Sequence, residues 1–422
     1  MTDQTKAIIG VRNGWGGETP FGLACRDRRH HVYVIGKTGA GKTTLLRNLI
    51  LQDIAAGRGV GLIDPHGDLA DDLLDHIPPW RADDLVYFHP ADIDHPIGLN
   101  LLESVPEEGR SLVASSVVSI FKSIWRDSWG PRLEYILYNA VAALLDCPNT
   151  SLLGLQRIFV DDVFRSRVVR QVKDPVVRSF WENEFARYDR RFLQEAIAPI
   201  QNKVGQLLAS STIRNILGQV RSTIDLRFMM DNRRILIANL SKGQLGEDKA
   251  NLLGAVLVAK FQLAALGRAD APEESREDFY LYIDEFQNFT TDAFVSILSE
   301  ARKYRLCLTL SHQYLTQLSQ ETSDAVLGNA GTLISFRIGN RDAQVLEREI
   351  AFSARHLCDL ANHRICVKML DRGDYGESFQ ATTLPPVPGL HGRREKLIRR
   401  SREKYGTPRA KIEEKLRRWR GG

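Results

Sequence analysis

A glycine-rich run between an apolar stretch and an amphipathic stretch constrains this chain more than any other feature. Residues 36–43 read GKTGAGKT; residues 31–35 before them form a strand-like apolar run, and residues 44–56 after them have helical spacing. Strand, G-x-x-x-x-G-K-T and helix in this order predict a phosphate-binding loop, because the glycines let backbone N–H groups converge on phosphate oxygens at a helix N-terminus. The alternative is a glycine-rich turn that binds nothing, and both pattern and context favour the phosphate site. The expected nucleotide contacts are Gly36, Thr38, Gly39, Ala40, Gly41, Lys42, Thr43 and Thr44.

Charge and cysteine content limit the class of protein. The net charge of +5 is uneven, because residues 392–422 carry 13 Lys and Arg against 4 Asp and Glu, a net of +9, and the rest of the chain carries −4. Five cysteines without C-x-x-C spacing are typical of reduced thiols in a cytoplasmic protein. The N-terminus lacks the apolar core of a signal peptide, and no apolar run reaches 18 residues, so we expect no membrane span.

The order of strand-like and helical segments predicts an α/β fold. Apolar strand-like runs alternate with helical ones on both sides of a long, mostly helical stretch, which predicts a parallel sheet covered on both faces plus an all-helical insertion. We expect a β-type lead-in over residues 1–30, a first part of the nucleotide-binding sheet over 31–100, the helical insertion over 101–232, a second part of the sheet over 233–390 and a basic helical tail over 391–422.

Two adjacent acids follow a late apolar strand. Asp284 and Glu285 end the run FYLYI, where an acid on a neighbouring parallel strand can reach a Mg²⁺ ion that Thr43 also holds. A second carboxylate beside it can act as general base toward the attacking water. We therefore assign Asp284 to the metal and Glu285 to the water, with ATP and Mg²⁺ as cofactors and Lys42 on the β- and γ-phosphates.

Three further residues are candidates for catalysis. Gln313 follows the next strand, where its amide can bond the γ-phosphate or the water; the alternative is a solvated loop residue. Arg302 lies on the polar face of the helix after Glu285, and Arg337 ends another expected strand. Either arginine could stabilise the transferred phosphoryl group on a neighbouring subunit, or be an ordinary surface charge.

Two features leave their alternatives open. Asp64 and His66, in the turn after the second expected strand, face the nucleotide or a neighbouring subunit, or else cap a turn. The tail from Arg393 to Arg420 is either a solvated or interface helix or an element that docks nucleic acid or a partner.

Taken together, several stretches resemble the HerA/FtsK superfamily of ring-forming P-loop ATPases, and most closely the coupling ATPases of conjugative type IV secretion. The matching stretches are His31–Thr43, Leu62–Asp68, Ser128–Arg132, Tyr282–Phe289, Ser311–Gln313 and Phe336–Asn340. The resemblance implies a RecA-like sheet, a homo-hexameric ring and DNA passing through its pore. It places the family's lysine, threonine, metal acid and catalytic acid on Lys42, Thr43, Asp284 and Glu285, and it favours Arg302 over Arg337 as the arginine finger.

The resemblance leaves three functions to compare. The first is an ATP-driven DNA translocase with sequence-tolerant contacts to the phosphate backbone. The second is an ATPase scaffold that assembles and regulates a partner effector, bound through the basic tail or the helical insertion. The third is a motor that moves a protein substrate to a secretion channel. Membrane coupling proteins normally begin with transmembrane helices, so a cytoplasmic chain of this kind would be recruited to the membrane by a partner.

Overall fold

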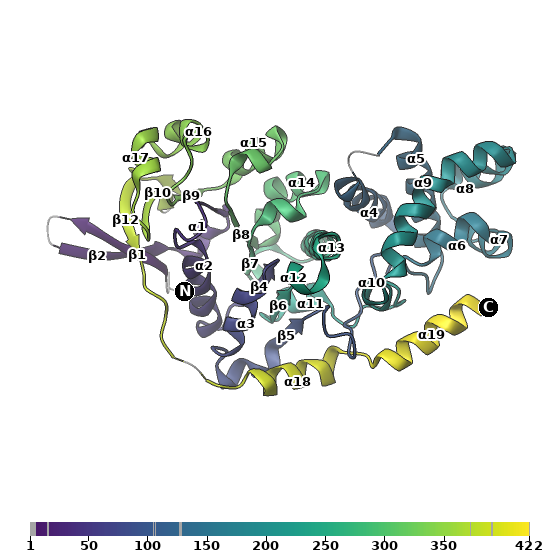
Figure 1. Ribbon diagram of the computed structural model, residues 1–422, viewed down its shortest axis with the longest axis horizontal. Coiled ribbons are helices and arrows are strands. Elements are labelled where there is room, and N and C mark those ends of the chain that lie inside the picture. Colours follow the sequence, from purple (N-terminus) through teal and green to yellow (C-terminus); the bar gives the residue numbers. More distant parts are fainter. Residues whose placement is uncertain are drawn as a thin grey trace.

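The computed structural model describes residues 6–421 apart from 15, 16, 104, 106, 126–128, 372 and 390. Ser128, from one of the motifs above, and residues 1–5 of the expected lead-in lie outside the described residues. A sheet with helices on both faces makes up one part of the molecule, and a group of helices lies at one end of it (Figure 1). The predicted fold class, an α/β sheet with a helical insertion, is confirmed.

The described residues form one sheet of twelve strands. They are β1 (Ala7–Gly14), β2 (Gly17–Leu23), β3 (Val32–Ile35), β4 (Gly59–Asp64), β5 (Leu85–Phe88), β6 (Ile235–Asn239), β7 (Phe279–Ile283), β8 (Leu306–His312), β9 (Thr332–Ser335), β10 (Arg364–Asp371), β11 (Asp374–Tyr375) and β12 (Phe379–Thr383). The order across the sheet is β2-β1-β12-β10-β9-β3-β8-β7-β4-β6-β5, with β11 paired to β10. Strands β9 to β5 in this order are parallel, and the hairpin β1–β2 joins the opposite end through antiparallel pairing with β12.

Helices cover both faces of the parallel part. The helices of this part are α1 (Cys25–Arg28), α2 (Lys42–Ala55), α3 (Asp68–Leu74), α12 (Lys242–Leu245), α13 (Glu247–Leu266), α14 (Asp292–Glu300), α15 (Gln320–Asn329), α16 (Asn340–Ile350) and α17 (Ala354–Asp359). Along β3, Val32 and Val34 pack into the core that contains α2 and α3, whereas Tyr33 and Ile35 pack into the core that contains α13 and α14. Burial on both faces explains why the central strands are apolar throughout instead of alternating.

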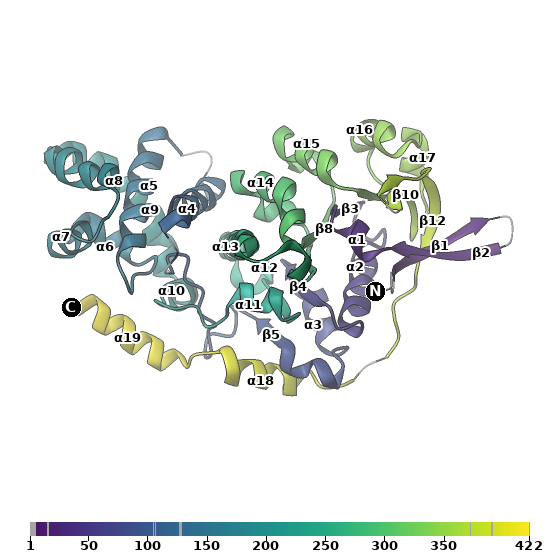
Figure 2. The same cartoon turned by 180° about the vertical axis from the view of Figure 1, so that it is seen from behind.

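Between β5 and β6 the described chain folds into helices and turns. The helices are α4 (Arg110–Ile124), α5 (Pro131–Asp146), α6 (Gly154–Val160), α7 (Asp162–Val169), α8 (Pro175–Ser179), α9 (Arg190–Ala209), α10 (Ser211–Leu217) and α11 (Leu226–Asp231). Three of these helices begin after an aspartate that caps the first turn. The side chains of Asp161, Asp174 and Asp189 accept hydrogen bonds from backbone N–H groups of the helix that follows. The group α4 to α10, called here the helical segment, lies at one end of the molecule (Figures 1 and 2).

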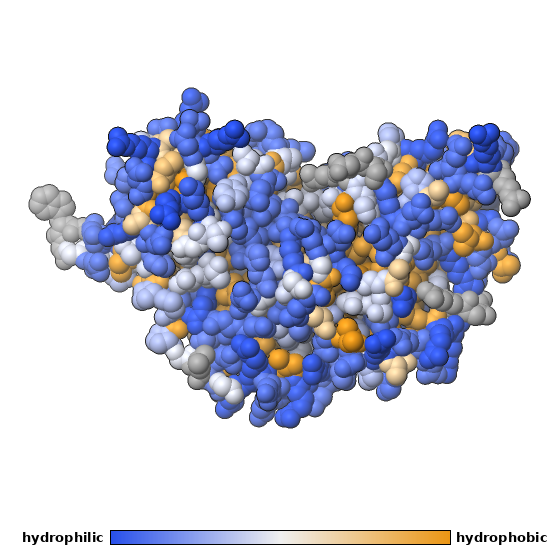
Figure 3. Space-filling model, viewed as in Figure 1, coloured by the Kyte–Doolittle hydropathy of each residue, from blue (hydrophilic) through white to orange (hydrophobic). Residues whose placement is uncertain are grey.

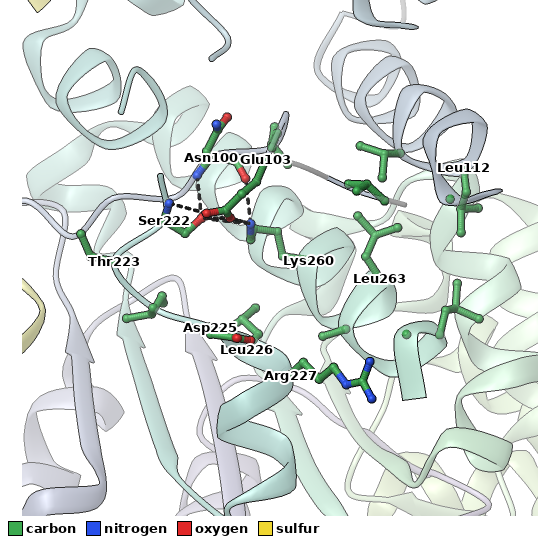
Figure 4. A pocket seen from close by; sticks show the side chains of 18 of the residues that line it. Asn100, Glu103, Leu112, Ser222, Thr223, Asp225, Leu226, Arg227, Lys260 and Leu263 are labelled. Atoms are coloured by element: carbon green, nitrogen blue, oxygen red, sulfur yellow. Dashed lines mark hydrogen bonds and ion pairs between the residues drawn. The ribbon is translucent and has the colours of Figure 1, made fainter. Parts of the chain in front are cut away.

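Two linkers join the helical segment to the sheet, one containing Gly98 before α4 and one containing Thr223 after α10. The two linkers are hydrogen-bonded to each other. The backbone N–H of Thr223 donates to the carbonyl of Gly98 at 3.0 Å, and the N–H of Gly98 donates to Thr223 Oγ1 at 3.0 Å. Lys260 of α13 reaches both linkers, since its Nζ lies 2.7 Å from the carbonyl oxygen of Asn100 and 3.2 Å from Ser222 Oγ (Figure 4). A cavity of about 750 Å³ lies beside this contact, between the linkers, α4 and α13.

One described helix, Glu247–Asp270, is long and apolar enough to cross a bilayer by length and composition. Its mean hydropathy over 18 residues is 1.5, and 67% of that window is buried inside the molecule. Among its contacts are α4 and α11, so its apolar surface packs within the protein.

The C-terminal residues form two helices, α18 (Arg394–Tyr405) and α19 (Arg409–Gly421). They run along one side of the molecule from the sheet to the helical segment (Figures 1 and 2). Both helices of the basic tail are bonded to the rest of the same chain, α18 through Ser401 and α19 through Trp419. On the face drawn in Figure 3, hydrophilic residues dominate and hydrophobic ones form small separate groups.

The buried His31, just before β3, is hydrogen-bonded to helix α14 and to the neighbouring strand β8. His31 precedes β3 with a φ of 64° and is 2% exposed. Its Nε2 lies 3.1 Å from the carbonyl oxygen of Leu298 in α14, and its Nδ1 accepts the backbone N–H of Leu308 at 3.2 Å. One donor and one acceptor are what a neutral imidazole offers. Burial is the main cause that lowers the pKa of His31, to about 4.

The depressed pKa of His31 predicts acid sensitivity. At pH 5 the unfolded chain protonates this imidazole and the folded chain does not, so the free energy of unfolding falls as pH drops from about 6.5 toward 4, by up to roughly 3 kcal/mol. We expect His31→Asn, in which Asn tolerates the positive φ, to flatten this pH dependence in chemical denaturation at pH 7 and pH 4.5. The exposed His66→Asn is the control, and an equal flattening in both variants would exclude His31 as the cause.

Candidate functional site

The phosphate loop joins β3 to α2, as expected from its sequence. Gly39 and Gly41 have φ of 76° and 121°, and α2 begins at Lys42 without a side-chain cap on its first turn. Its first backbone N–H groups therefore point out of the helix end, where they suit an anion. Ala40 is buried, while Thr38, Gly39 and Thr43 are exposed at the loop surface and Thr44 is half-buried.

The Lys42 side chain is folded back into the loop. It is 6% exposed, and its Nζ donates to the carbonyl oxygen of Gly36 at 2.5 Å and to that of Lys37 at 3.4 Å. Burial lowers the pKa of Lys42, while the nearby charges of Glu285 and Asp284 act in the opposite direction. A buried ammonium that donates to carbonyl oxygens here is well placed to donate to phosphate oxygens instead.

Asp284 and Glu285 lie directly after β7, and each is 5% exposed. The backbone N–H of Asp284 donates to the carbonyl of Ile63 in β4, and Asp284 Oδ1 accepts the N–H of Glu285 at 3.1 Å. Glu285 adopts a left-handed backbone, with a φ of 46°, which is a strained conformation for a residue other than glycine.

Asp64 caps a turn, which resolves one of the two open alternatives. It is fully buried, and its two carboxylate oxygens accept the backbone N–H groups of His66 and Ala70, each at 2.9 Å. The negative charge of Asp64 nevertheless acts on Asp284. Burial, followed by the charges of Asp64 and Glu285, raises the pKa of Asp284 to about 6. His66 itself is exposed.

These residues fit a divalent cation that is held partly by phosphate. The buried carboxylates of Asp284 and Glu285 act on one ammonium, Lys42, and the buried Asp64 adds a third negative charge near Asp284, so negative charge is in excess and a cation would relieve it. Within the described part of the chain no group of three His, Cys, Asp or Glu is arranged to hold a metal by itself. Mg²⁺ at phosphate sites usually has one or two protein ligands, with waters and phosphate oxygens as the others.

Gln313 bridges the loop and the acids. Strand β8 lies between β3 and β7, so the residue after it stands between Lys42 and Glu285. Its Nε2 donates to Glu285 Oε1 at 2.7 Å, and its Oε1 accepts the hydroxyl of Thr38 at 3.0 Å. The neighbouring His312 is buried; its Nδ1 lies 3.0 Å from the Tyr33 hydroxyl, and burial lowers the pKa of His312 to about 3.

The two candidate arginines lie at opposite ends of the parallel strands, Arg302 before β8 and Arg337 after β9. Strand β9 ends at Ser335, so Arg337 follows the strand instead of ending it; its carbonyl accepts the N–H of Lys37, and its Nη2 donates to Asn362. Arg302 precedes β8 in the 3-10 turn Ala301–Tyr304 after α14, with its Nη1 3.2 Å from His30 Nδ1. Arg337 therefore lies beside the phosphate loop of its own chain, and Arg302 lies away from it.

Two sets of contacts were not singled out from the sequence. At the site, Gln287 Nε2 donates to Glu285 Oε2 at 2.8 Å. Near the C-terminal end of α2, away from the phosphate loop, Asp53 accepts Arg28 on both oxygens at 2.7 Å and the hydroxyl of Tyr282 at 2.5 Å, all fully buried. The sequence signal for this second set is an aspartate on the apolar face of a helix, beside Leu49 and Ile54.

Comparison with known protein families identifies the family of the chain. The model described as the central domain of helicase HerA matches residues 16–261, more than half of the chain, and the chain belongs to this family. A second model, described as the TraM recognition site of TraD and TraG, matches residues 278–348. The family suggested by the sequence motifs is thereby confirmed.

Individual relatives are more distant. The type 4 coupling protein DotL of Legionella pneumophila subsp. pneumophila is 23% identical over 375 residues, covering 74% of this chain and 48% of DotL. The chain thus spans about half the length of the curated relative it matches. Among solved structures, the bacterial conjugative coupling protein TrwBdeltaN70 has a TM-score of 0.64 at 14% identity, covering 92% of this chain and 90% of that one. VirB4 of Thermoanaerobacter pseudethanolicus has a TM-score of 0.62 at 13% identity, covering 91% and 98%. At these identities the structures share the fold.

The loop geometry predicts different tolerance at two of its glycines. Gly39→Ala and Gly41→Ala both place a side chain in a left-handed backbone, at a cost of about 1–2 kcal/mol each. Only at Gly41 does the added Cβ also meet neighbours, 2.9 Å from His363 Nδ1 and 3.0 Å from Phe336 Cε1. We expect Gly41→Ala to weaken binding of a fluorescent ATP analogue at least tenfold more than Gly39→Ala. Equal affinities of the two variants would contradict this account.

Proposed function

We propose that this chain is an ATP-hydrolysing motor that assembles as a ring and moves DNA through the central pore. The observation that carries the proposal is the continuous arrangement of Lys42, Gln313 and Glu285 across β3, β8 and β7, next to the buried Asp284. A phosphate loop, a metal acid and a base held in hydrogen-bond contact are the parts that nucleotide hydrolysis requires.

Each residue has a role in this proposal. Lys42 and the first N–H groups of α2 bind the phosphates of ATP, and Thr43 with Asp284 would hold Mg²⁺. When bound, that ion neutralises charge on the phosphate oxygens. Glu285 accepts the proton of the attacking water, and Gln313, bonded to both the loop and Glu285, connects the two.

The relatives support a nucleotide-driven function on DNA. HerA is a helicase, DotL is a type 4 coupling protein, and solved structures of TrwB hold ADP with Mg²⁺ or an ATP analogue. The position of Arg302 fits an assembly, because an arginine at the opposite edge from its own loop can act only on the nucleotide of another subunit. We propose Arg302 as that finger, and residues 101–232 as a separate domain of the motor.

The scaffold alternative rests on the basic tail and on the expected lack of a membrane anchor. The helices of the tail pack against the sheet and the helical segment of the same chain, and we therefore give the motor precedence.

Site variants test the proposal in an ATPase assay with and without DNA at low salt. We expect Lys42→Ala to abolish tight nucleotide binding, and Glu285→Gln to keep binding but lower kcat roughly 10²- to 10⁴-fold, since a general base contributes that range. Arg302→Ala should lower kcat with nucleotide affinity retained. Glu300→Gln, an exposed acid of α14, is the control.

Each part of the proposal has its own contrary outcome. A Glu285→Gln enzyme with unchanged kcat would exclude Glu285 as the base, and an unchanged Arg302→Ala rate would exclude that finger. If DNA leaves the ATPase rate of the unmodified protein unchanged at low salt, translocation is excluded while ATP hydrolysis stands. Electron microscopy with an ATP analogue and DNA should show a ring with density in its pore.

A further inference from the structure

Among the described residues, two neutral amides donate to the carboxylate of Glu285, and no cation forms an ion pair with it. Gln313 Nε2 donates to Oε1 at 2.7 Å and Gln287 Nε2 donates to Oε2 at 2.8 Å. The ammonium of Lys42, whose charge interacts with that of Glu285, donates to the carbonyls of Gly36 and Lys37 instead. The direction of the carboxylate is therefore set by the two glutamines.

The two glutamines differ in what holds them. Gln313 follows β8 and is bonded to Thr38 of the phosphate loop, so its partners lie where the nucleotide would bind. Gln287 belongs to the same tight turn as Glu285. In that turn, Asn288 donates to the Glu285 carbonyl from both its backbone N–H and its Nδ2, at 3.1 and 2.8 Å, and Lys242 Nζ in turn donates to Asn288 Oδ1 at 2.8 Å. Gln287 is fixed relative to Glu285, and Gln313 is fixed relative to the loop.

We propose that Gln287 is a positioning residue that keeps the Glu285 carboxylate directed at the attacking water when Gln313 changes partners during the ATPase cycle. This inference rests on the proposed ATPase function. A carboxylate turned even slightly from its target loses rate without losing substrate affinity, because the misalignment affects the transition state and not the bound ground state.

The variant Gln287→Leu tests this role. It removes the amide donor from a side chain whose buried Oε1 has no hydrogen-bond partner, so little else is lost. We expect kcat to fall roughly tenfold while the KM for ATP stays within about twofold, the pattern of an interaction made only in the transition state. Gln244→Leu, which changes a glutamine of α12 that contacts His89, is the matched control.

The outcomes separate the inference from the proposed function. If kcat is unchanged, or if KM rises as kcat falls, Gln287 does not position the base. If the unmodified protein hydrolyses no nucleotide, the proposed function itself fails, whatever the variant does. Binding of a fluorescent ATP analogue to Gln287→Leu confirms that its site is folded.

A second inference comes from the C-terminal helices. Helix α18 lies on β5, the last strand of the sheet, where Ser401 Oγ accepts the backbone N–H of Tyr87 at 2.9 Å. The turn that follows is bonded to the same part of the protein, through the N–H of Thr407 to the Pro96 carbonyl and the N–H of Arg409 to the Asp94 carbonyl. These contacts cover an otherwise open strand edge.

Helix α19 continues onto the helical segment. The Trp419 ring contacts Phe164 of α7 edge-on, with centroids 5.8 Å apart, and the Arg157 guanidinium lies over both rings and donates to the Trp419 carbonyl at 2.6 Å. Ile412 and Leu416 are buried on the same helix. The end of the chain is thus anchored mainly by apolar and aromatic contact.

The charges of α18 are paired with acids of the sheet part. Arg394 pairs with Asp75 at 2.9 Å, Arg402 with Asp92 at 2.5 Å, and Arg400 with Asp83. The three arginines are 40–47% exposed, so salt screens these pairs. In α19 the ion pairs lie within the helix, between Arg409 and Glu413 and between Arg418 and Glu414.

We propose that residues 394–419 are a strap that fixes the helical segment against the sheet. Trp419 is its apolar anchor, and the ion pairs of α18 are a second, salt-sensitive attachment. The strap adds to the two linkers and to the packing of α4 on α13 and α14, and its release would leave the far end of the helical segment free to move.

Hydrogen exchange of the full chain tests the strap. We expect Trp419→Ala to speed amide exchange at least tenfold in α19, in α7 and in the linker 218–225, and to leave α2 and β7 unchanged. Trp80→Ala, which removes an exposed tryptophan of the sheet part, is the matched control. For the unmodified protein, 1 M NaCl should speed exchange in α18 more than in α19.

Contrary outcomes are equally specific. If Trp419→Ala changes exchange in α19 alone, the tail does not hold the helical segment and the strap is excluded. If DNA slows exchange in α18 and NaCl does not speed it, the basic face of α18 binds nucleic acid, and its ion pairs do not attach the strap to the sheet part.

Discussion

The insertion of β8 between β3 and β7 is the constraint on which the rest of the site depends. Parallel strands end at one edge, so three loops far apart in the sequence open beside each other. The middle position gives Gln313 contacts to both neighbours, at 3.0 Å to Thr38 and 2.7 Å to Glu285. If β3 and β7 were adjacent, the phosphate loop and Glu285, the proposed base, would meet without a residue that touches both.

The parts of the site that the sequence predicts are those encoded locally. Lys42 and Asp284 are found because each belongs to a short pattern attached to an apolar strand, and the α/β fold follows from the alternation of such strands with helices. Gln287 was not found, because its role depends on the left-handed turn at Glu285, which folds it back onto the carboxylate. Arg28 and Asp53 pair across elements distant in sequence, and no local pattern specifies such a partner.

The tail shows why net charge alone could not decide between interpretations. A sum of +9 describes how many cations residues 392–422 hold, not what they face. Because the rest of the chain is net acidic, Asp75, Asp83 and Asp92 offer partners within the same molecule. Both a nucleic-acid arm and an intramolecular strap have the same composition, and only the placement of those acids on one side of the sheet part distinguishes them.

Helix α13 connects the catalytic turn with the linkers of the helical segment. After Glu285 the chain turns through Phe289, whose ring packs so closely on α13 that a Cβ at Gly254 would lie 2.2 Å from it. Further along the same helix, Lys260 holds both linkers through the Asn100 carbonyl and Ser222. A buried helix transmits displacement as a rigid body, since close-packed interiors have no slack to absorb it. The turn that carries the proposed base and the linkers that carry the helical segment therefore share one rigid element, while the proposed strap ties the far end of that segment to the opposite side of the sheet part.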